Sequence, residues 1–300
     1  ARNPEQASDL LPDTAPESPP ADDTSLLEAA RQAAEKAAVI HADARGRVDP
    51  SRWTAKGRSD FVTEVDVDSE QAIVSTLMEL FPDHEVLAEE GTEAGANAGR
   101  APVRWIIDPL DGTTNWLHGY PEYAVSIAAE DADGLRAAVV LNSATGELFE
   151  ASRGAGARRD GQPIRVSEFG DLNLALVGTG FPFKKLNVLP AYLETMSRIL
   201  RATAGIRRAG AAALDLCDLA CGRLDCFWEY WLMPWDVAAG ALIVREAGGT
   251  FEPLEVPGLD TGTVEPGGGW SEGLAPGAFI GANAALMAEF RTLVTGGLPK

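Results

Sequence analysis

The sequence predicts an α/β protein, and three observations support this fold class. Its 300 residues are enough for one large α/β unit or for two subdomains that share a cleft. Residues 25–38 predict a helix, because small apolar residues recur on one face after Ser25-Leu26-Leu27-Glu28, a capping-box pattern. Short apolar runs at 103–107, 124–129 and 135–141 instead predict buried strands.

The remaining elements alternate between the two types. Further helices are predicted at about 67–81, 191–203, 211–221 and 237–247, and further strands at 85–88, 147–151 and 174–177. The glycines at 154–161 predict a hairpin, since no Gly-x-Gly-x-x-Gly spacing opens a helix there. Residues 252–277 contain four prolines and three consecutive glycines, which indicates a surface loop.

Residues 1–23 differ in composition from the rest of the chain. They hold five prolines among acidic and small residues. Such a segment cannot bury enough apolar surface to offset the entropy lost on ordering. We therefore predict a disordered tail, with a partner-binding segment as the alternative.

Charge and hydropathy exclude several classes of partner. The chain has 25 Lys and Arg against 45 Asp and Glu, a net charge of −20. This charge argues against nucleic acid or an anionic membrane as the main partner. No apolar run reaches the roughly 18 residues that span a membrane, and no signal-peptide layout is visible. We expect a soluble, cytoplasmic protein.

The three cysteines do not predict a metal site. Cys217, Cys221 and Cys226 have no histidine nearby, so a zinc ion would lack a fourth ligand. They are expected to act as small apolar residues.

The run Asp108-Pro109-Leu110-Asp111 is the first candidate for a functional site. It follows the predicted strand 103–107, and Pro109 keeps Asp108 extended before a sharp turn through Gly112. Carboxylates at the carboxyl end of a strand suit Mg²⁺, and the Leu110 carbonyl is a plausible further oxygen ligand. Gly112-Thr113-Thr114-Asn115 offers groups that suit phosphate oxygens. An ordinary Asp/Gly turn is the alternative for this run alone.

Three further acidic residues lie where elements begin or end. Glu89, with Glu90, follows the predicted strand at 85–88, although paired glutamates are usually just solvated. Asp236 is predicted to be the N-cap of an apolar helix, and Asp66 opens the helix near 67. For both, a plain helix cap is the alternative to a functional role.

Taken together, these residues resemble the signature blocks of the inositol monophosphatase family over about residues 25–295. The matching blocks are Asp60 to Asp66, Ala88-Glu89-Glu90-Gly91, Trp105 to Pro121 and Pro234-Trp235-Asp236-Val237-Ala238-Ala239-Gly240. The segments 178–183 and 207–215 resemble bacterial members in particular. Ala88, Trp116 and Ala211 depart from common family residues, and only Ala211 would alter a substrate-side contact.

The resemblance implies a fold and an activity. The fold would be a layered αβαβα sandwich, shared with fructose-1,6-bisphosphatases. We place an N-terminal subdomain at 24–166, with most metal ligands, and a C-terminal one at 167–300, with Asp236 and substrate-side residues. The activity would be that of a phosphoric monoester hydrolase that uses two to three Mg²⁺ ions, is inhibited by Li⁺ and forms a homodimer.

The resemblance also implies a role for each site residue. Glu89, Asp108 and the Leu110 carbonyl would hold one Mg²⁺, and Asp108, Asp111 and Asp236 a second, with a third and weaker ion near Glu89. Glu89 and Thr113, the latter linked to Asp66, would orient and deprotonate the attacking water. The substrate would meet Asp111, Gly112, Thr113, Ala212, Glu229, Asp236 and Lys56.

In-line attack by water is favoured over covalent catalysis, because the chain has only three histidines and no Gly-x-Ser-x-Gly or Cys/His arrangement. The favoured substrate is myo-inositol monophosphate. Fructose-1,6-bisphosphate, histidinol phosphate and 3′-phosphoadenosine 5′-phosphate are alternatives, since fold does not fix substrate. A regulatory protein that binds transcription machinery is the alternative from another class.

Overall fold

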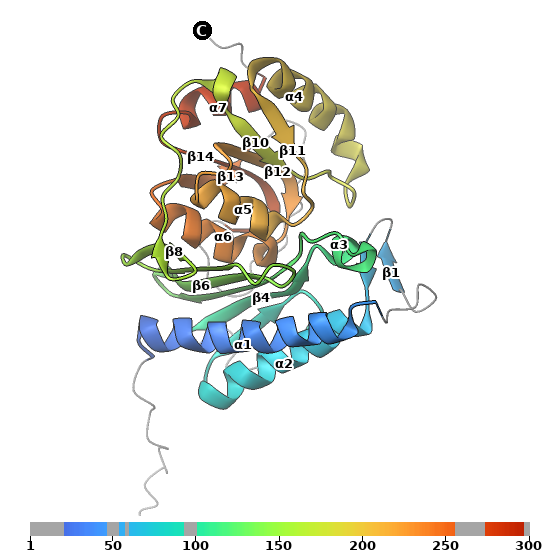
Figure 1. Cartoon of the computed structure of the whole chain (residues 1–300), viewed down its shortest axis with the longest axis vertical. Coiled ribbons are helices and arrows are strands. Elements are labelled where there is room, and N and C mark those ends of the chain that lie inside the picture. Colours follow the sequence, from blue (N-terminus) through green and yellow to red (C-terminus); the bar gives the residue numbers. More distant parts are fainter. Residues whose placement is uncertain (1–20, 47–53, 58–59, 93–100, 256–273, 297–300) are drawn as a thin grey trace, which may run out of the picture.

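The protein, described here as a computed structural model, is a stack of alternating helix and sheet layers (Figure 1). The structure describes residues 21–46, 54–57, 60–92, 101–255 and 274–296. Two helices cover one face of a seven-stranded sheet, two more lie between it and a five-stranded sheet, and a last pair covers the outer face. This confirms the αβαβα sandwich.

The first layer is formed by α1 (Asp23–Ala44) and α2 (Glu64–Leu80). Their apolar faces pack with Trp105 and Ile107 beneath the larger sheet. The predicted capping box at Ser25 is wrong, because α1 begins at Asp23 and Ser25 lies inside its first turn. Asp22 is the N-cap, and its carboxylate accepts a hydrogen bond from the Ser25 amide at 2.7 Å.

The seven-stranded sheet has the order β3-β4-β5-β6-β7-β8-β9. Only β3 and β4 pair in parallel; the other neighbours are antiparallel. The bounds are β3 Glu85–Ala88, β4 Arg104–Asp111, β5 Ala124–Asp131, β6 Gly134–Asn142, β7 Leu148–Ser152, β8 Gly156–Arg159 and β9 Gln162–Pro163. The predicted hairpin at 154–161 is confirmed by the turns between β7, β8 and β9.

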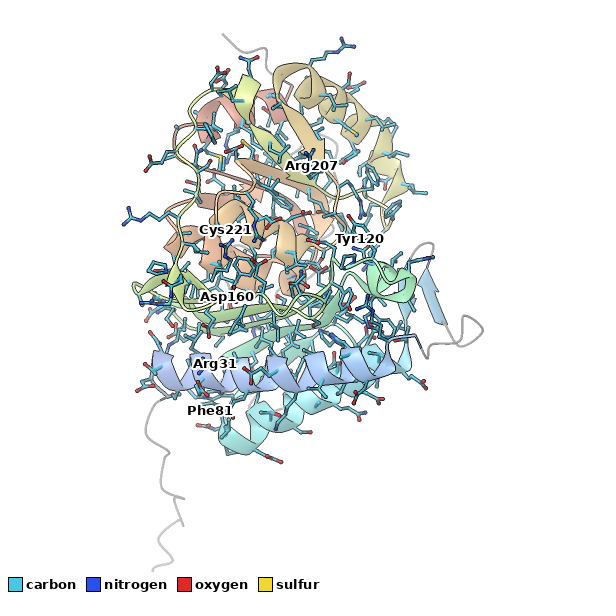
Figure 2. The ribbon with its side chains drawn as sticks, viewed as in Figure 1. Arg31, Phe81, Tyr120, Asp160, Arg207 and Cys221 are labelled. Carbon is cyan, nitrogen blue, oxygen red and sulfur yellow. The ribbon has the colours of Figure 1, made fainter. Side chains whose placement is uncertain are left out.

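The middle layer consists of α5 (Ala212–Ala220) and α6 (Pro234–Glu246). Every residue from 237 to 244 is buried. A helix that is apolar on all sides is typical of a position between two sheets. Cys221, just beyond α5, also lies in this layer (Figure 2). Cys217, Cys221 and Cys226 are all free thiols.

The five-stranded sheet has the order β11-β10-β12-β14-β13 and is mixed, with parallel pairs on both sides of β10. Its bounds are β10 Leu176–Thr179, β11 Gly205–Arg207, β12 Cys226–Leu232, β13 Thr250–Leu254 and β14 Gly277–Ala282. The outer layer holds α4 (Leu189–Ala202) and α7 (Met287–Val294), which pack on the buried rings of this sheet.

Short elements complete the chain. The helix α3 (Thr113–His118) follows β4, β1 (Thr54–Gly57) pairs with β2 (Asp60–Val62), and 3₁₀ turns lie at Leu172–Leu174 and Leu186–Val188.

Two predictions fall largely outside the described residues. The tail was predicted to end at residue 23, but Asp22 and Asp23 belong to the cap and first turn of α1; residues 1–20 are not described. The loop predicted at 252–277 begins and ends in β13 and β14, and its residues 256–273 are not described. The subdomain boundary at residue 166 stays a prediction.

Candidate active site

The site is built around an irregularity at the end of β4. The register between β4 and β5 shifts between Asp108 and Asp111, which is the signature of a β-bulge. The carboxylate of Asp108 accepts a hydrogen bond from the Leu110 amide at 3.0 Å, so the Asx-type turn proposed as the alternative is present. Asp108 is nevertheless only 2% exposed and borders a pocket, which an ordinary surface turn does not do.

Asp111 is tied to the middle layer. Its Oδ2 accepts a hydrogen bond from the Ala213 amide at 2.7 Å, in the first turn of α5. The amides of a first helical turn have no partner within the helix, and the helix dipole favours a carboxylate there. This contact joins two residues 102 positions apart and connects the larger sheet to the helix layer.

Gly112 allows the chain to leave β4 and enter α3. Its φ is +87°, in the left-handed region, and a Cβ there would lie 2.8 Å from the Glu122 carbonyl oxygen. Both facts require glycine. Thr113 thereby becomes the first residue of α3.

The Thr113 hydroxyl is held by two acceptors. It lies 3.0 Å from Asp66 Oδ1 and 3.1 Å from the Leu110 carbonyl oxygen. The other oxygen of Asp66 accepts hydrogen bonds from the Thr63 amide and hydroxyl, at 2.9 and 2.6 Å. Asp66 is thus the third residue of α2 in a capping box with Thr63, and it also contacts Thr113. Burial raises its pKa.

Glu89 stands just beyond β3, as predicted, and is half-buried. The ammonium of Lys184 is 4.0 Å from its Oε1.

Sequence reasoning missed the residue that shapes the turn after Glu89. Glu70 of α2 is 1% exposed, and its two oxygens accept hydrogen bonds from the amides of Glu90 and Thr92 at 2.8 and 3.0 Å.

The signal for Glu70 is its spacing. It lies four residues after Asp66, so both carboxylates are on one face of α2. One end of this helix therefore touches both Thr113 and the Glu89 turn.

Asp236 comes from the middle layer. The prediction that it is an N-cap is wrong, because α6 begins at Pro234 and Met233 is the cap residue. Asp236 is the third helical residue, and its Oδ2 accepts a hydrogen bond from the Met233 amide at 2.7 Å. Pro234, in the first turn, has no amide hydrogen, and it suits the start of a helix because an amide there has no partner within the helix.

One pocket brings these side chains together. Its lining includes Glu89, Asp108, Leu110, Asp111, Thr113 and Asp236. In the described part of the chain, no three acidic, histidine or cysteine side chains are close enough to hold a metal ion as they stand. The predicted metal ligands thus border the same space without forming a chelating cluster.

A second part of the pocket lies between α5 and β12. Ala212, Asp111, Asp236 and Glu229 border it, which brings the predicted substrate-side residues together. A Cβ on Gly180 would overlap the Glu229 carboxylate, so this glycine makes room for it. The backbone of Lys56 belongs to β1, but its side chain is outside what the structure describes.

Comparison with known proteins decides the family. The model of the inositol monophosphatase family matches residues 22–268. The chain belongs to the inositol monophosphatase family.

Individual relatives agree with this assignment. Nus factor SuhB of Pseudomonas aeruginosa is 46% identical over 226 residues, which cover 75% of this chain and 83% of that protein. The extragenic suppressor protein SuhB from Bartonella henselae has a TM-score of 0.80 at 35% identity, covering 91% of this chain and all of that one. The match to inositol monophosphatase from Anabaena has a TM-score of 0.76 at 30% identity and covers 92% of this chain and 97% of that one.

In this inositol monophosphatase family member, like charges dominate the pocket. Burial, followed by the charges of Glu89, Asp111 and Asp236, raises the pKa of Asp108 well above its ordinary value. Burial and Asp236 raise the pKa of Asp111 to about 7. Burial likewise raises the pKa of Glu229 to about 8, against the opposing effect of Arg208. The pocket is therefore a site that favours cations.

No helix in the described ranges combines the length and the apolar character needed to cross a membrane.

Proposed function

We propose that this chain is a Mg²⁺-dependent phosphatase for a small phosphate monoester, with myo-inositol monophosphate as the favoured substrate. One observation carries the proposal. Four carboxylates border a single pocket: those of Glu89, Asp108 and Asp111 come from the larger sheet, and that of Asp236 from the helix layer between the sheets. Membership of the inositol monophosphatase family supports phosphatase activity in general; the substrate is part of the proposal.

The donor set fits magnesium. Carboxylate and carbonyl oxygens are the ligands that hard divalent cations prefer. Burial is the main cause of the raised pKa values of Asp108 and Asp111, and repulsion between neighbouring carboxylates adds to it. Bound Mg²⁺ would remove that repulsion.

Each ligand has a proposed place. Glu89, Asp108 and the Leu110 carbonyl would hold one ion, Asp108, Asp111 and Asp236 a second, and Glu89 would neighbour a third. When bound, the ions would lower the pKa of a water molecule and neutralise phosphate oxygens. Asp108 and Asp111 each have one oxygen held by a backbone amide, which restricts the motion of the carboxylate.

Thr113 would position the attacking water. Its hydroxyl proton points to Asp66 or to the Leu110 carbonyl, because both are acceptors. The Thr113 oxygen can then accept a hydrogen bond from water, and Glu89 would take the proton that the water loses. Gly112 and Thr113 would contact the phosphate.

The hydroxyls of the alcohol would meet Asp111, Ala212 and Glu229, which border the second part of the pocket. Lys56 would lie near the phosphate. Fructose-1,6-bisphosphate, histidinol phosphate and 3′-phosphoadenosine 5′-phosphate stay alternatives. Inhibition by Li⁺, a homodimer and a cytoplasmic location belong to the same proposal.

The experiment is phosphate release from a panel of these phosphate monoesters, with and without Mg²⁺, by the full chain and by Asp236→Asn. We expect release only with Mg²⁺, fastest from inositol monophosphate, and a large loss in Asp236→Asn. Turnover without a metal would contradict the mechanism. Faster release from another member of the panel would reassign the substrate.

A second role is favoured by a different observation. Relatives that are 41–46% identical are called Nus factors or putative Nus factors. We propose that this chain also binds transcription machinery. Purified RNA polymerase should be retained by the immobilised chain and by Asp236→Asn, because this role does not need catalysis. If neither retains the polymerase, the second role is wrong.

A further inference from the structure

The last turn of α1 holds a buried histidine that has no part in the function proposed above. His41 is 0% exposed. Its helical neighbours Ile40 and Ala44 pack against a small apolar cluster that contains Leu110. Leu110 lies within the β-bulge at the end of β4, between the two aspartates of that bulge. The end of α1 therefore supports the segment of β4 that is proposed to bind metal.

Three contacts fix the position of His41. Its Nδ1 lies 2.9 Å from the hydroxyl oxygen of Ser143, in the turn between β6 and β7. Its backbone carbonyl accepts a hydrogen bond from the Trp116 indole at 3.2 Å. Its ring makes an edge contact with Tyr123, at a centroid distance of 6.4 Å. The ring is therefore held by segments from three other parts of the chain.

The second ring nitrogen is not satisfied in the same way. Nε2 is buried, and within the described ranges no hydrogen bond of normal geometry reaches it. The Pro109 carbonyl is close enough to the ring to favour its protonated form, but burial is the larger effect and lowers the pKa of His41 to about 4. The imidazole is therefore neutral at pH 7. A buried polar atom without a hydrogen bond is costly, so its presence calls for an explanation.

The contact with Ser143 bears on which nitrogen carries the proton. In a neutral histidine, the hydrogen bond made by one nitrogen sets the protonation of the other. A serine hydroxyl can rotate to donate. When Ser143 donates to Nδ1, the ring proton is on Nε2, and Nε2 is then a donor beside the Pro109 carbonyl.

The peptide unit that joins Pro109 to Leu110 connects this histidine to a proposed metal ligand. Its amide group, that of Leu110, donates to the Asp108 carboxylate at 3.0 Å, and its carbonyl group is the one beside His41. Because a peptide unit is planar, a group that fixes its carbonyl end also fixes its amide end. The proposed ligands border one pocket but do not form a chelating cluster among the described residues, so the bulge has to adjust when an ion binds.

We propose that His41 is a positioning residue for the metal site: in the metal-bound protein, its Nε2–H donates a hydrogen bond to the Pro109 carbonyl and thereby holds Asp108 and the Leu110 carbonyl in place. This role rests on the proposed Mg²⁺-dependent function. His41 itself contacts neither metal nor substrate, and its effect passes through the peptide unit between Pro109 and Leu110.

The first test is calorimetric titration of the full chain with Mg²⁺. His41→Phe keeps a buried ring and removes both nitrogens, and we expect the Kd for Mg²⁺ to rise by about tenfold, as for other partners of metal ligands. His41→Gln keeps an amide donor and should recover part of this loss. His84→Phe is the matched control, because His84 is also buried, at 2% exposed, and is stacked on Phe81. Its Kd should equal that of the unaltered chain. Thermal melting checks that each variant folds.

The second test uses the unaltered side chain. The chain has three histidines, so the ¹⁵N signals of the His41 ring can be assigned by elimination with His84→Phe and His118→Gln. In EDTA we expect a neutral ring that is protonated on Nε2. Addition of Mg²⁺ should shift the Nε2–H signals of His41 and leave those of His84 unchanged.

The outcomes separate this inference from the proposed function. If Mg²⁺ binds but the His41 signals do not move, or if His41→Phe folds and binds Mg²⁺ as tightly as His84→Phe, the positioning role is wrong and the metal site stands. If the unaltered chain binds no Mg²⁺, both the metal site and the role of His41 are wrong.

Discussion

At the scale of single residues, the pocket combines groups that repel one another. Asp108, Asp111 and Glu229 are buried, and burial is the largest cause of each raised pKa. Arg208 opposes the effect at Glu229 and also at Asp111. Such groups destabilise the metal-free fold whenever they are ionised.

The stability of the metal-free protein should therefore fall with rising pH. Folding raises the pKa of Asp111 from about 4 in the unfolded chain to about 7, and that of Glu229 to about 8. The folded state thus holds protons more tightly, and stability decreases from about pH 4 to about pH 8. We expect Tm in EDTA to be several degrees lower at pH 8 than at pH 5.5.

Two comparisons check the cause of this pH dependence. Asp111→Asn should flatten it, because the variant has no charge to bury at that position. Mg²⁺ should raise Tm more at pH 8 than at pH 5.5, since metal ligands must be ionised. A Tm that rises with pH in EDTA would contradict the electrostatic account.

Gly180 offers a test of the substrate side. Gly180→Ala places a Cβ where the Glu229 carboxylate lies, so the carboxylate must move. If Glu229 contacts the alcohol and not the reacting phosphate, KM should rise by about tenfold with a smaller change in kcat. Gly205→Ala is the matched control, because a Cβ there makes only ordinary contacts of 3.6 Å or more. A fall in kcat without a change in KM would place Glu229 elsewhere in the mechanism.

At the scale of elements, α2 connects two parts of the site. Asp66, in its first turn, contacts Thr113, and Glu70, one turn later, holds the amides that follow Glu89. The helix is anchored by its apolar face against the larger sheet. Its position therefore sets the distance between Thr113 and Glu89.

Glu70→Gln should weaken this arrangement without removing a proposed ligand. The amide side chain keeps one acceptor and loses the other, so the turn at Glu89 becomes less fixed. We expect the apparent Mg²⁺ affinity, measured from the metal dependence of phosphate release, to fall by about tenfold, as for other partners of metal ligands. Glu79→Gln, on the exposed part of α2, is the control. Equal Mg²⁺ dependence in both variants would show that Glu70 is only structural.

The elements also show what sequence could and could not predict. Apolar periodicity located α1, α2, α4, α5 and α6 and the strands β3 to β7 and β10, because these patterns are local, but α7, β12 and β14 were not predicted. The cap residues of α1 and α6 were misassigned, since several polar residues near a helix start can accept the same amides. Glu70 was missed because its partners are 20 and 22 residues away, and a buried glutamate on an amphipathic helix looks like a solvated one.

At the scale of the whole molecule, the site depends on the layer order. Asp108 and Asp111 come from the larger sheet, Asp236 from the helices between the sheets, and Glu229 from the smaller sheet. Residues more than 120 positions apart therefore border one pocket. The family resemblance predicted this grouping; composition and periodicity alone predicted only that carboxylates follow strands. The aromatic side chains of Phe181, Phe183 and Trp231 in the pocket lining, and the bulge at Trp231, were not predicted by either.

The most direct test of the central claim is the Mg²⁺ dependence of phosphate release by Asp108→Asn, with inositol monophosphate as substrate. Asp108 is the one carboxylate proposed to hold two ions, and Asp133→Asn, in an exposed turn, is the matched control. We predict that Asp108→Asn loses more than about a hundredfold in activity at any Mg²⁺ concentration, because even outer-shell partners of metal ligands contribute 10- to 100-fold. The control should keep full activity. Full activity in Asp108→Asn, or release that does not depend on Mg²⁺ in the unaltered chain, would contradict the account.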